Sequence, residues 1–175
     1  KSCFFGCSSI EKVPLPKSIT TIGANCFGEC KSLTEIEIPD SVTFLGEMVF
    51  SGCDSLTKVS IPTSITQIPK YAFRNCSSLE TITIPESVTL IDDYSFEDSN
   101  IKTIIIPSKV TKIGSYSFYE CQNLTDIQIP TSVSSIGSYS FSRCENLTQI
   151  TIPSSIMIIE EGLFKECPKL TDVVL

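Results

Sequence analysis

The sequence predicts an α/β solenoid, in which about seven complete 23-residue repeats stack and pair their strands in a parallel β-sheet. Three observations predict it. Pro, Phe and Cys each recur at a nearly constant spacing along the 175 residues. Each repeat contains one short stretch that alternates apolar and polar residues, and each is too short to bury its own apolar side chains. Stacking buries them, because equivalent residues of neighbouring turns then lie one strand spacing apart.

The spacing is regular enough to define the repeat residue by residue. The steps are 23 residues throughout, except for one step of 22 in the fourth repeat, where Ser99 also occupies the Cys position. The common pattern is L-x-x-I-x-I-P-x-S-[VI]-T-x-I-G-x-x-x-F-x-x-C-x-x, and below we number its positions from 1 to 23. Complete repeats begin at Ile10, Leu33, Leu56, Leu79, Ile101, Leu124 and Leu147.

Each element follows from this pattern. Residues 33–38 alternate as a strand with one buried face, and Pro39 ends that strand because it has no amide to donate. Residues 41–45, which are β-branched at Val42 and Thr43, predict a second short extended piece, followed by a turn at Gly46. Residues 115–121 predict a short helical turn that directs Phe118 and Cys121 inward.

A single array over residues 1–175 is expected. Both ends cut through the pattern, leaving partial repeats at 1–9 and 170–175. Repeat arrays need polar caps over their terminal cores, and neither end resembles one. The sequence therefore predicts a fragment of a longer array.

Composition argues against several classes of function. The net charge is −7, which is unsuited to binding nucleic acid. The sequence contains no run of 18 apolar residues, so no membrane span is predicted. His is absent, so His-based catalysis and His-containing metal sites are excluded. No nucleophile–base pair, phosphate loop or metal motif stands out from the repeat pattern. We expect no enzymatic activity, no catalytic residue, no cofactor and no bound metal.

The motif I-P-x-S-V-T-x-I-G-x-x-x-F-x-x-C, seen in residues 38–53 and again in 129–144, resembles leucine-rich repeats of the BspA-like type. The resemblance covers the whole chain. It implies a leucine-rich repeat solenoid without enzymatic activity. It also implies a protein displayed at the cell surface or outside the cell, where several family members adhere to host cells or matrix proteins.

In leucine-rich repeats, the outward-facing strand residues lie on the concave face. By the two-residue period of a strand, these are positions 3 and 5 of each repeat. The residues at these positions vary along the chain, while the buried positions do not, which indicates either a contact surface or an ordinary wet strand face. The predicted protein-binding residues are Glu35, Glu37, Lys58, Ser60, Thr81, Thr83, Thr103, Ile105, Asp126, Gln128, Gln149 and Thr151.

Two other features have competing interpretations. Tyr71, Tyr94, Tyr116 and Tyr139 share one position and predict an aromatic stripe, either a binding surface or rings that stack and cover the edge of the core. The fourth repeat is rich in acidic residues and indicates either a cation site or a solvated patch offset by its basic neighbours. We favour packing for the stripe and solvation for the patch. The missing residue should tighten a turn and change the local curvature.

Seven of the nine cysteines occupy the repeat position and are explained as small packing residues. Cys3 and Cys26 lie one repeat apart outside that position and are the best candidates for a disulfide. Three glycosylation sequons, at Asn75, Asn123 and Asn146, give weak support for secretion.

Taken together, the residues and the resemblance predict a non-enzymatic protein-binding array, an adhesin-like protein that recognises host or matrix proteins. The alternative is a cytoplasmic leucine-rich repeat scaffold or regulator that binds a cytosolic protein through the same face.

Overall fold

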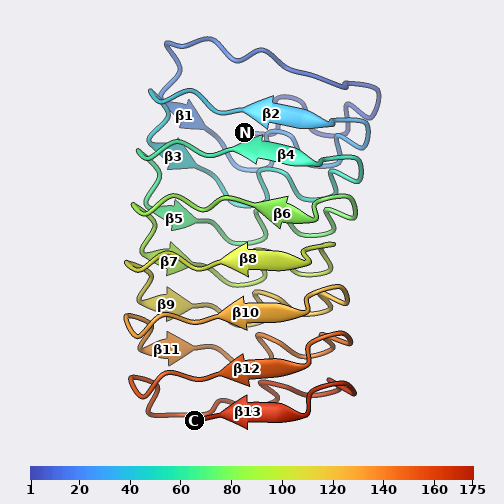
Figure 1. Ribbon diagram of the computed structural model, residues 1–175. Helices are drawn as coiled ribbons and strands as arrows, with labels where there is room; N and C mark the ends of the chain where they lie inside the picture. The colour runs from blue at the N-terminus through green and yellow to red at the C-terminus, as the bar shows by residue number, and fades with distance from the viewer.

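The computed structural model describes residues 1–175 as a stack of turns (Figure 1). Most turns contribute one strand to a first series and a second strand, usually shorter, to a second series. The first series of strands is β2 (Glu35–Glu37), β4 (Lys58–Ser60), β6 (Thr81–Ile82), β8 (Thr103–Ile105), β10 (Asp126–Gln128), β12 (Gln149–Thr151) and β13 (Asp172–Val174). The second series is β1 (Thr21–Ile22), β3 (Phe44–Leu45), β5 (Gln67–Ile68), β7 (Leu90–Ile91), β9 (Lys112–Ile113) and β11 (Ser135–Ile136).

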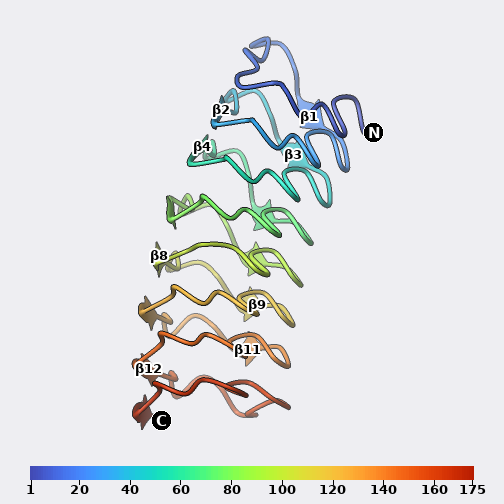
Figure 2. The ribbon, with the colours of Figure 1, turned by 90° about the vertical axis from the view of Figure 1, so that its right-hand side faces the viewer.

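All strand pairs are parallel and join equivalent positions of neighbouring turns. The first series is hydrogen-bonded in the order β13-β12-β10-β8-β6, with β2-β4 as a separate pair. The second series runs β11-β9-β7-β5, with β1-β3 separate. Figure 2 shows the two series on different sides of a gently bent stack. The predicted parallel solenoid is therefore confirmed.

The α/β class is wrong, because the chain contains no helix. The predicted helical turn at 115–121 is instead a third hydrogen-bonded side of the solenoid. Tyr116 and Glu120 adopt left-handed conformations, with φ of 56° and 58°. The amides of Tyr116, Phe118 and Glu120 donate to carbonyls of the next turn, at Ser138, Ser140 and Ser142. A helix would direct these amides to its own preceding turn, so bonding between turns replaces it.

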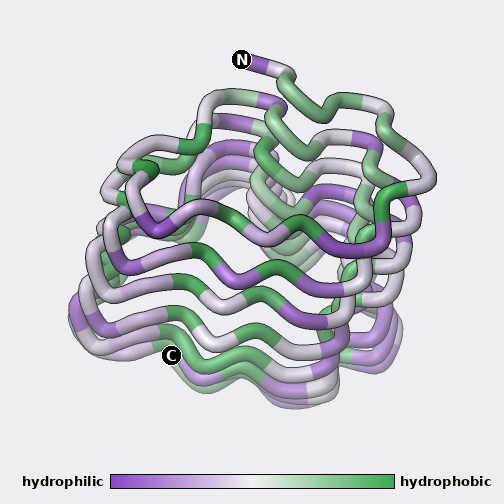
Figure 3. Tube along the Cα trace, turned by 90° about the horizontal axis from the view of Figure 1, so that it is seen from above, coloured by the Kyte–Doolittle hydropathy of each residue, from purple (hydrophilic) through white to green (hydrophobic).

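The core consists of columns of identical positions. The 42 buried apolar residues form one cluster from Ile22 to Leu163, so each turn covers its apolar groups with those of its neighbours. Phe side chains stack in one column with ring centroids 5.3 to 6.0 Å apart. Figure 3, which looks down the stack, shows hydrophobic positions recurring at the same places in successive turns. Stability therefore comes from contacts between neighbouring turns.

Polar side chains inside the repeat form ladders of their own. The Ser at position 9 donates its hydroxyl to a backbone carbonyl of the preceding turn, as between Ser64 and Val42 at 2.5 Å. The Thr at position 11 does the same, as between Thr89 and Thr66 at 3.3 Å. This confirms the prediction that these hydroxyls satisfy the backbone. The glycine at position 14 has a different role from the expected turn: a Cβ on Gly114 would lie 2.4 Å from the amide nitrogen of Asp93.

The shortened fourth repeat loses its residue at the corner that leads into β8. In other turns the amide at position 1 donates to the carbonyl of the Cys position, as from Leu124 to Cys121. Ile101 makes no such bond, and the amide of Asn100 instead reaches Cys76 in the preceding turn at 3.3 Å. Strands β6 and β8 still pair in register, Thr81 with Thr103. The shortened corner therefore changes its hydrogen bonding, and the strand ladder continues across it.

The cysteines at position 21 pack as predicted, and they also donate hydrogen bonds. Each thiol from Cys30 onward points to the carbonyl of the Phe in the preceding turn, as from Cys121 to Phe96 at 3.1 Å. Burial raises the pKa of Cys53 and of Cys121 to about 12. All nine cysteines are free, Cys3 and Cys26 included, so the expected disulfide is not formed.

Candidate protein-binding face

The first series of strands presents its outward side chains on one continuous surface, which we call the sheet face. In strands β4, β8, β10 and β12, the first and third residues are exposed and the middle residue is buried. All twelve predicted residues lie on this surface, with Thr83 immediately after β6, and only Glu35 among them is partly covered. The structure therefore brings the predicted residues together in two parallel rows, one from position 3 and one from position 5.

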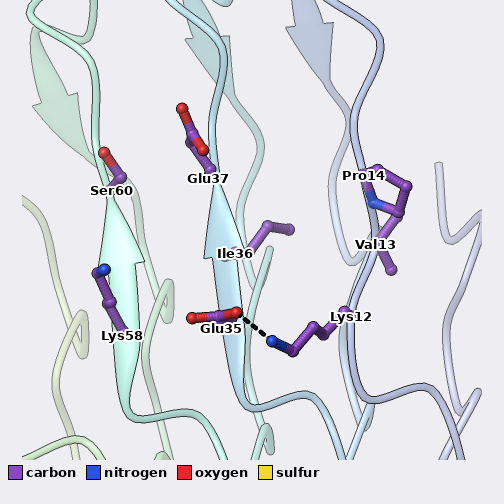
Figure 4. Close-up of a pocket in the computed structure, with 8 residues that line it drawn as sticks. All are labelled: Lys12, Val13, Pro14, Glu35, Ile36, Glu37, Lys58 and Ser60. Atoms are coloured by element: carbon purple, nitrogen blue, oxygen red, sulfur yellow. Dashed lines mark hydrogen bonds and ion pairs between the residues drawn. The ribbon is translucent and has the colours of Figure 1, made fainter.

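The N-terminal part of the sheet face carries charges of both signs. A depression of about 550 Å³ lies there, and its lining residues, drawn in Figure 4, are Lys12, Val13, Pro14, Glu35, Ile36, Glu37, Lys58 and Ser60. Lys12 Nζ lies 2.5 Å from Glu35 Oε1. This hydrogen bond lowers the pKa of Glu35 and raises the pKa of Lys12. Both side chains are well exposed, so the pair contributes little to stability.

The centre of the sheet face is uncharged and contains one fully presented apolar side chain. Ile105 is 82% exposed. Thr103 shares its strand, Gln128 of β10 pairs with it on one side, and Thr81 and Thr83 lie at β6 on the other. A buried Ile on the opposite side of the same strand, Ile104, is 5% exposed. The exposure of Ile105 is therefore a property of the face, because packing of the sheet does not require an apolar residue there.

The C-terminal part is acidic. A depression of about 360 Å³ is lined by Asp126, Ile127, Gln128, Ile129, Gln149, Ile150, Thr151, Asp172 and Val174. Gln149 pairs in register with Asp172, and Gln128 with Thr151. Neither Asp126 nor Asp172 forms an ion pair with any Lys or Arg of the chain. Asp172 and Val174 were outside the predicted set, although they occupy the same repeat positions in the incomplete last turn.

The tyrosine stripe is a self-stacked ladder. Ring centroids of Tyr71, Tyr94, Tyr116 and Tyr139 are 4.7, 4.8 and 5.0 Å apart. Its ends are covered as well: Lys70 Nζ lies 5.3 Å from the Tyr71 ring, and the Tyr139 ring packs against Gly162. The ring faces are therefore occupied within the chain, and the favoured packing interpretation agrees with this geometry.

Three of the six acidic residues of the fourth repeat, Glu80, Asp93 and Glu97, form ion pairs with basic residues of the neighbouring turns. Arg74 Nε lies 2.6 Å from Glu97 Oε2, and Lys102 Nζ lies 2.8 Å from Glu80 Oε1. Burial raises the pKa of Glu97 despite this pair. No group of three or more His, Cys, Asp or Glu side chains is placed to hold a metal ion. The observed pairs fit the interpretation of a solvated patch offset by its neighbours.

Comparison with known proteins identifies the family. The model of the BspA type leucine rich repeat region matches residues 1–125 and 111–175, with six copies. The chain belongs to this family. A search of curated protein sequences finds no significant match. The chain has no helix, and therefore no helical segment that could span a membrane.

Two solved structures share the fold of this BspA-type protein. A leucine-rich repeat protein of T. pallidum, TpLRR, is 27% identical with a TM-score of 0.62, and the match covers 94% of this chain and 69% of that one. A leucine rich cell surface protein from Faecalibacterium prausnitzii is 26% identical with a TM-score of 0.62. That match covers 99% of this chain and 63% of the other, so this chain spans less than two thirds of its length.

Proposed function

We propose that the chain is a non-enzymatic protein-binding array that acts at the cell surface and recognises host or matrix proteins through its sheet face. The observation that carries this proposal is Ile105, an apolar side chain 82% exposed at the neutral centre of a mainly polar surface. Exposed apolar groups rimmed by polar ones are typical of protein contact sites.

Family and chemistry support the same conclusion. The similar leucine-rich protein from Faecalibacterium prausnitzii is described as a cell surface protein. The sheet face offers hydroxyl, amide and carboxylate groups that can hydrogen-bond a partner. The buried thiols are unsuited to nucleophilic chemistry, because the thiolate is the reactive form and burial raises the pKa of Cys121 to about 12.

The alternative is a cytoplasmic scaffold or regulator that binds a cytosolic protein through the same face. Nine free cysteines favour it, since extracellular proteins commonly pair theirs. Buried thiols of raised pKa resist oxidation, however, so most of these cysteines are compatible with either compartment.

A binding screen against purified extracellular-matrix proteins tests the proposal. Charge reversals at Glu35, Lys58 and Asp126, and the Thr103→Arg substitution at the centre, should each reduce saturable binding. The matched control is Ile158→Arg, because Ile158 is 65% exposed and occupies the repeat position of Ser135, which belongs to the second series of strands. Binding that survives every change on the sheet face would place the contact elsewhere and contradict the proposal. Absence of matrix binding, together with direct binding of a purified cytosolic protein, would favour the alternative.

A further inference from the structure

We propose that the C-terminal half of the sheet face binds an extended, basic protein segment that carries an apolar residue three positions before a Lys or Arg. This inference rests on the proposed function and specifies its ligand. It concerns strands β8, β10, β12 and β13, which are consecutive in one hydrogen-bonded sheet.

The charge of this half has one sign. Asp126 and Asp172 face outward from β10 and β13, with Gln149 of β12 between them. No cation of the chain neutralises either carboxylate. The N-terminal half differs, because Lys12 and Lys58 lie beside Glu35 there. A cationic side chain placed over β12 would therefore meet two uncompensated carboxylates, one on each side.

The row at position 5 provides an uncharged track for the segment's backbone. It runs from Ile105 through Gln128 and Thr151 to Val174. Gln128 and Thr151 can hydrogen-bond peptide groups, while Ile105, 82% exposed, offers an apolar contact at one end. The carboxylates lie two residues away along each strand, about 6 to 7 Å, which is within reach of a Lys or Arg side chain.

The spacing sets the register of the ligand. Strand β12 lies two strands from β8, a distance of about 9.6 Å at the usual interstrand separation. A polyproline II segment advances about 9.3 Å in three residues and returns its side chains to the same side. An apolar side chain over Ile105 therefore places the third following residue over β12, between Asp126 and Asp172.

The test uses the whole chain and labelled peptides that each contain a single Leu-Pro-Pro-Lys motif. Binding is measured by fluorescence anisotropy at low and at raised salt. We expect saturable, salt-sensitive binding and a loss of about tenfold in affinity in the double variant Asp126→Asn, Asp172→Asn, the ratio that two exposed ion pairs give together. Ile105→Arg should also weaken binding.

Matched controls isolate the charge and the register. The variant Glu47→Gln, Glu145→Gln removes two exposed carboxylates outside the sheet face and should bind as the parent does. Leu-Pro-Pro-Glu peptides should fail, and peptides with Leu and Lys adjacent should bind more weakly.

Equal binding of Lys and Glu peptides, or no effect of the Asp126 and Asp172 changes, overturns the inference. Matrix-protein binding that is lost in Ile105→Arg while these peptides do not bind would overturn the basic ligand alone. If the peptides do not bind and matrix-protein binding also survives Ile105→Arg, the proposed function is overturned as well.

Discussion

Two serines at the same repeat position should respond to alanine in opposite directions. Ser117 and Ser140 both precede the core Phe and are both 0% exposed. The Ser140 hydroxyl donates to the Gly114 carbonyl at 2.8 Å, whereas the Ser117 hydroxyl has no partner. A buried polar group without a partner costs about 1 to 3 kcal/mol, while a satisfied hydrogen bond contributes about 1 kcal/mol. Ala72 shows that the position accepts alanine.

Ser117→Ala should therefore stabilise the chain by about 1 to 2 kcal/mol, and Ser140→Ala should destabilise it by about 1 kcal/mol. For a chain of this size each kcal/mol shifts the midpoint of thermal unfolding by about 2 to 4 °C. Calorimetry or circular dichroism on the two variants measures the shifts directly. A fall in the midpoint of both variants by the same amount would refute the reasoning, because it would mean that both hydroxyls are satisfied.

Three further predictions concern thiols, glycine and pH. In the native chain at pH 8, Cys121 should resist alkylation because burial raises its pKa to about 12, while exposed Cys3 should react. Mass spectrometry of labelled peptides measures both rates, and equal rates for Cys121 and Cys3 would contradict the prediction. Gly137→Ala should lower the unfolding midpoint through an overlap, because its Cβ would lie 2.4 Å from the Ser115 amide nitrogen, and an unchanged midpoint would show that the turns can separate at no cost. Burial in the folded state raises the pKa of Glu97, so there is a pH range in which Glu97 is protonated in the folded chain and ionised in the unfolded chain. The contribution of Glu97 to the free energy of unfolding is therefore greatest at acid pH and falls as pH rises through the raised pKa. In Glu97→Gln that fall should disappear from denaturation curves measured across the acid range, and an identical pH profile would contradict the assignment.

The strands and the core could be predicted from sequence because they depend on position within the repeat. Val59 and Ile82 occupy equivalent positions, alternate with polar neighbours, and are both buried. The serine and threonine ladders could be predicted for the same reason. Once the turns are stacked, the hydroxyls of Ser64 and Thr89 donate hydrogen bonds to backbone carbonyls of the adjacent turn.

The third side of the solenoid could not be predicted in the same way. Local propensity at residues 115–121 favours a helical turn, but the amides of Tyr116 and Phe118 bond to the next turn. Left-handed conformations at non-glycine residues are unfavourable in isolation. In this chain, hydrogen bonds between turns impose these conformations. The sequence of a single repeat does not show such bonds.

The candidate site was predictable as a set of positions but not as a surface with distinct parts. Alternation placed Asp126 and Ile105 outward. The exposure of Ile105, the Lys12–Glu35 ion pair and the unpaired Asp126 and Asp172 carboxylates depend on which turns are neighbours in space.

The claim that the sheet face is the binding surface is tested most directly by one pair of substitutions. Ile105→Arg and Ile158→Arg each place the same side chain at an exposed isoleucine, on the sheet face and at a repeat position of the second series of strands respectively. Binding of a matrix protein retained by the screen is measured for both by surface plasmon resonance. The account predicts loss of binding in Ile105→Arg and parent-like binding in Ile158→Arg. Loss in Ile158→Arg with full binding in Ile105→Arg would contradict it.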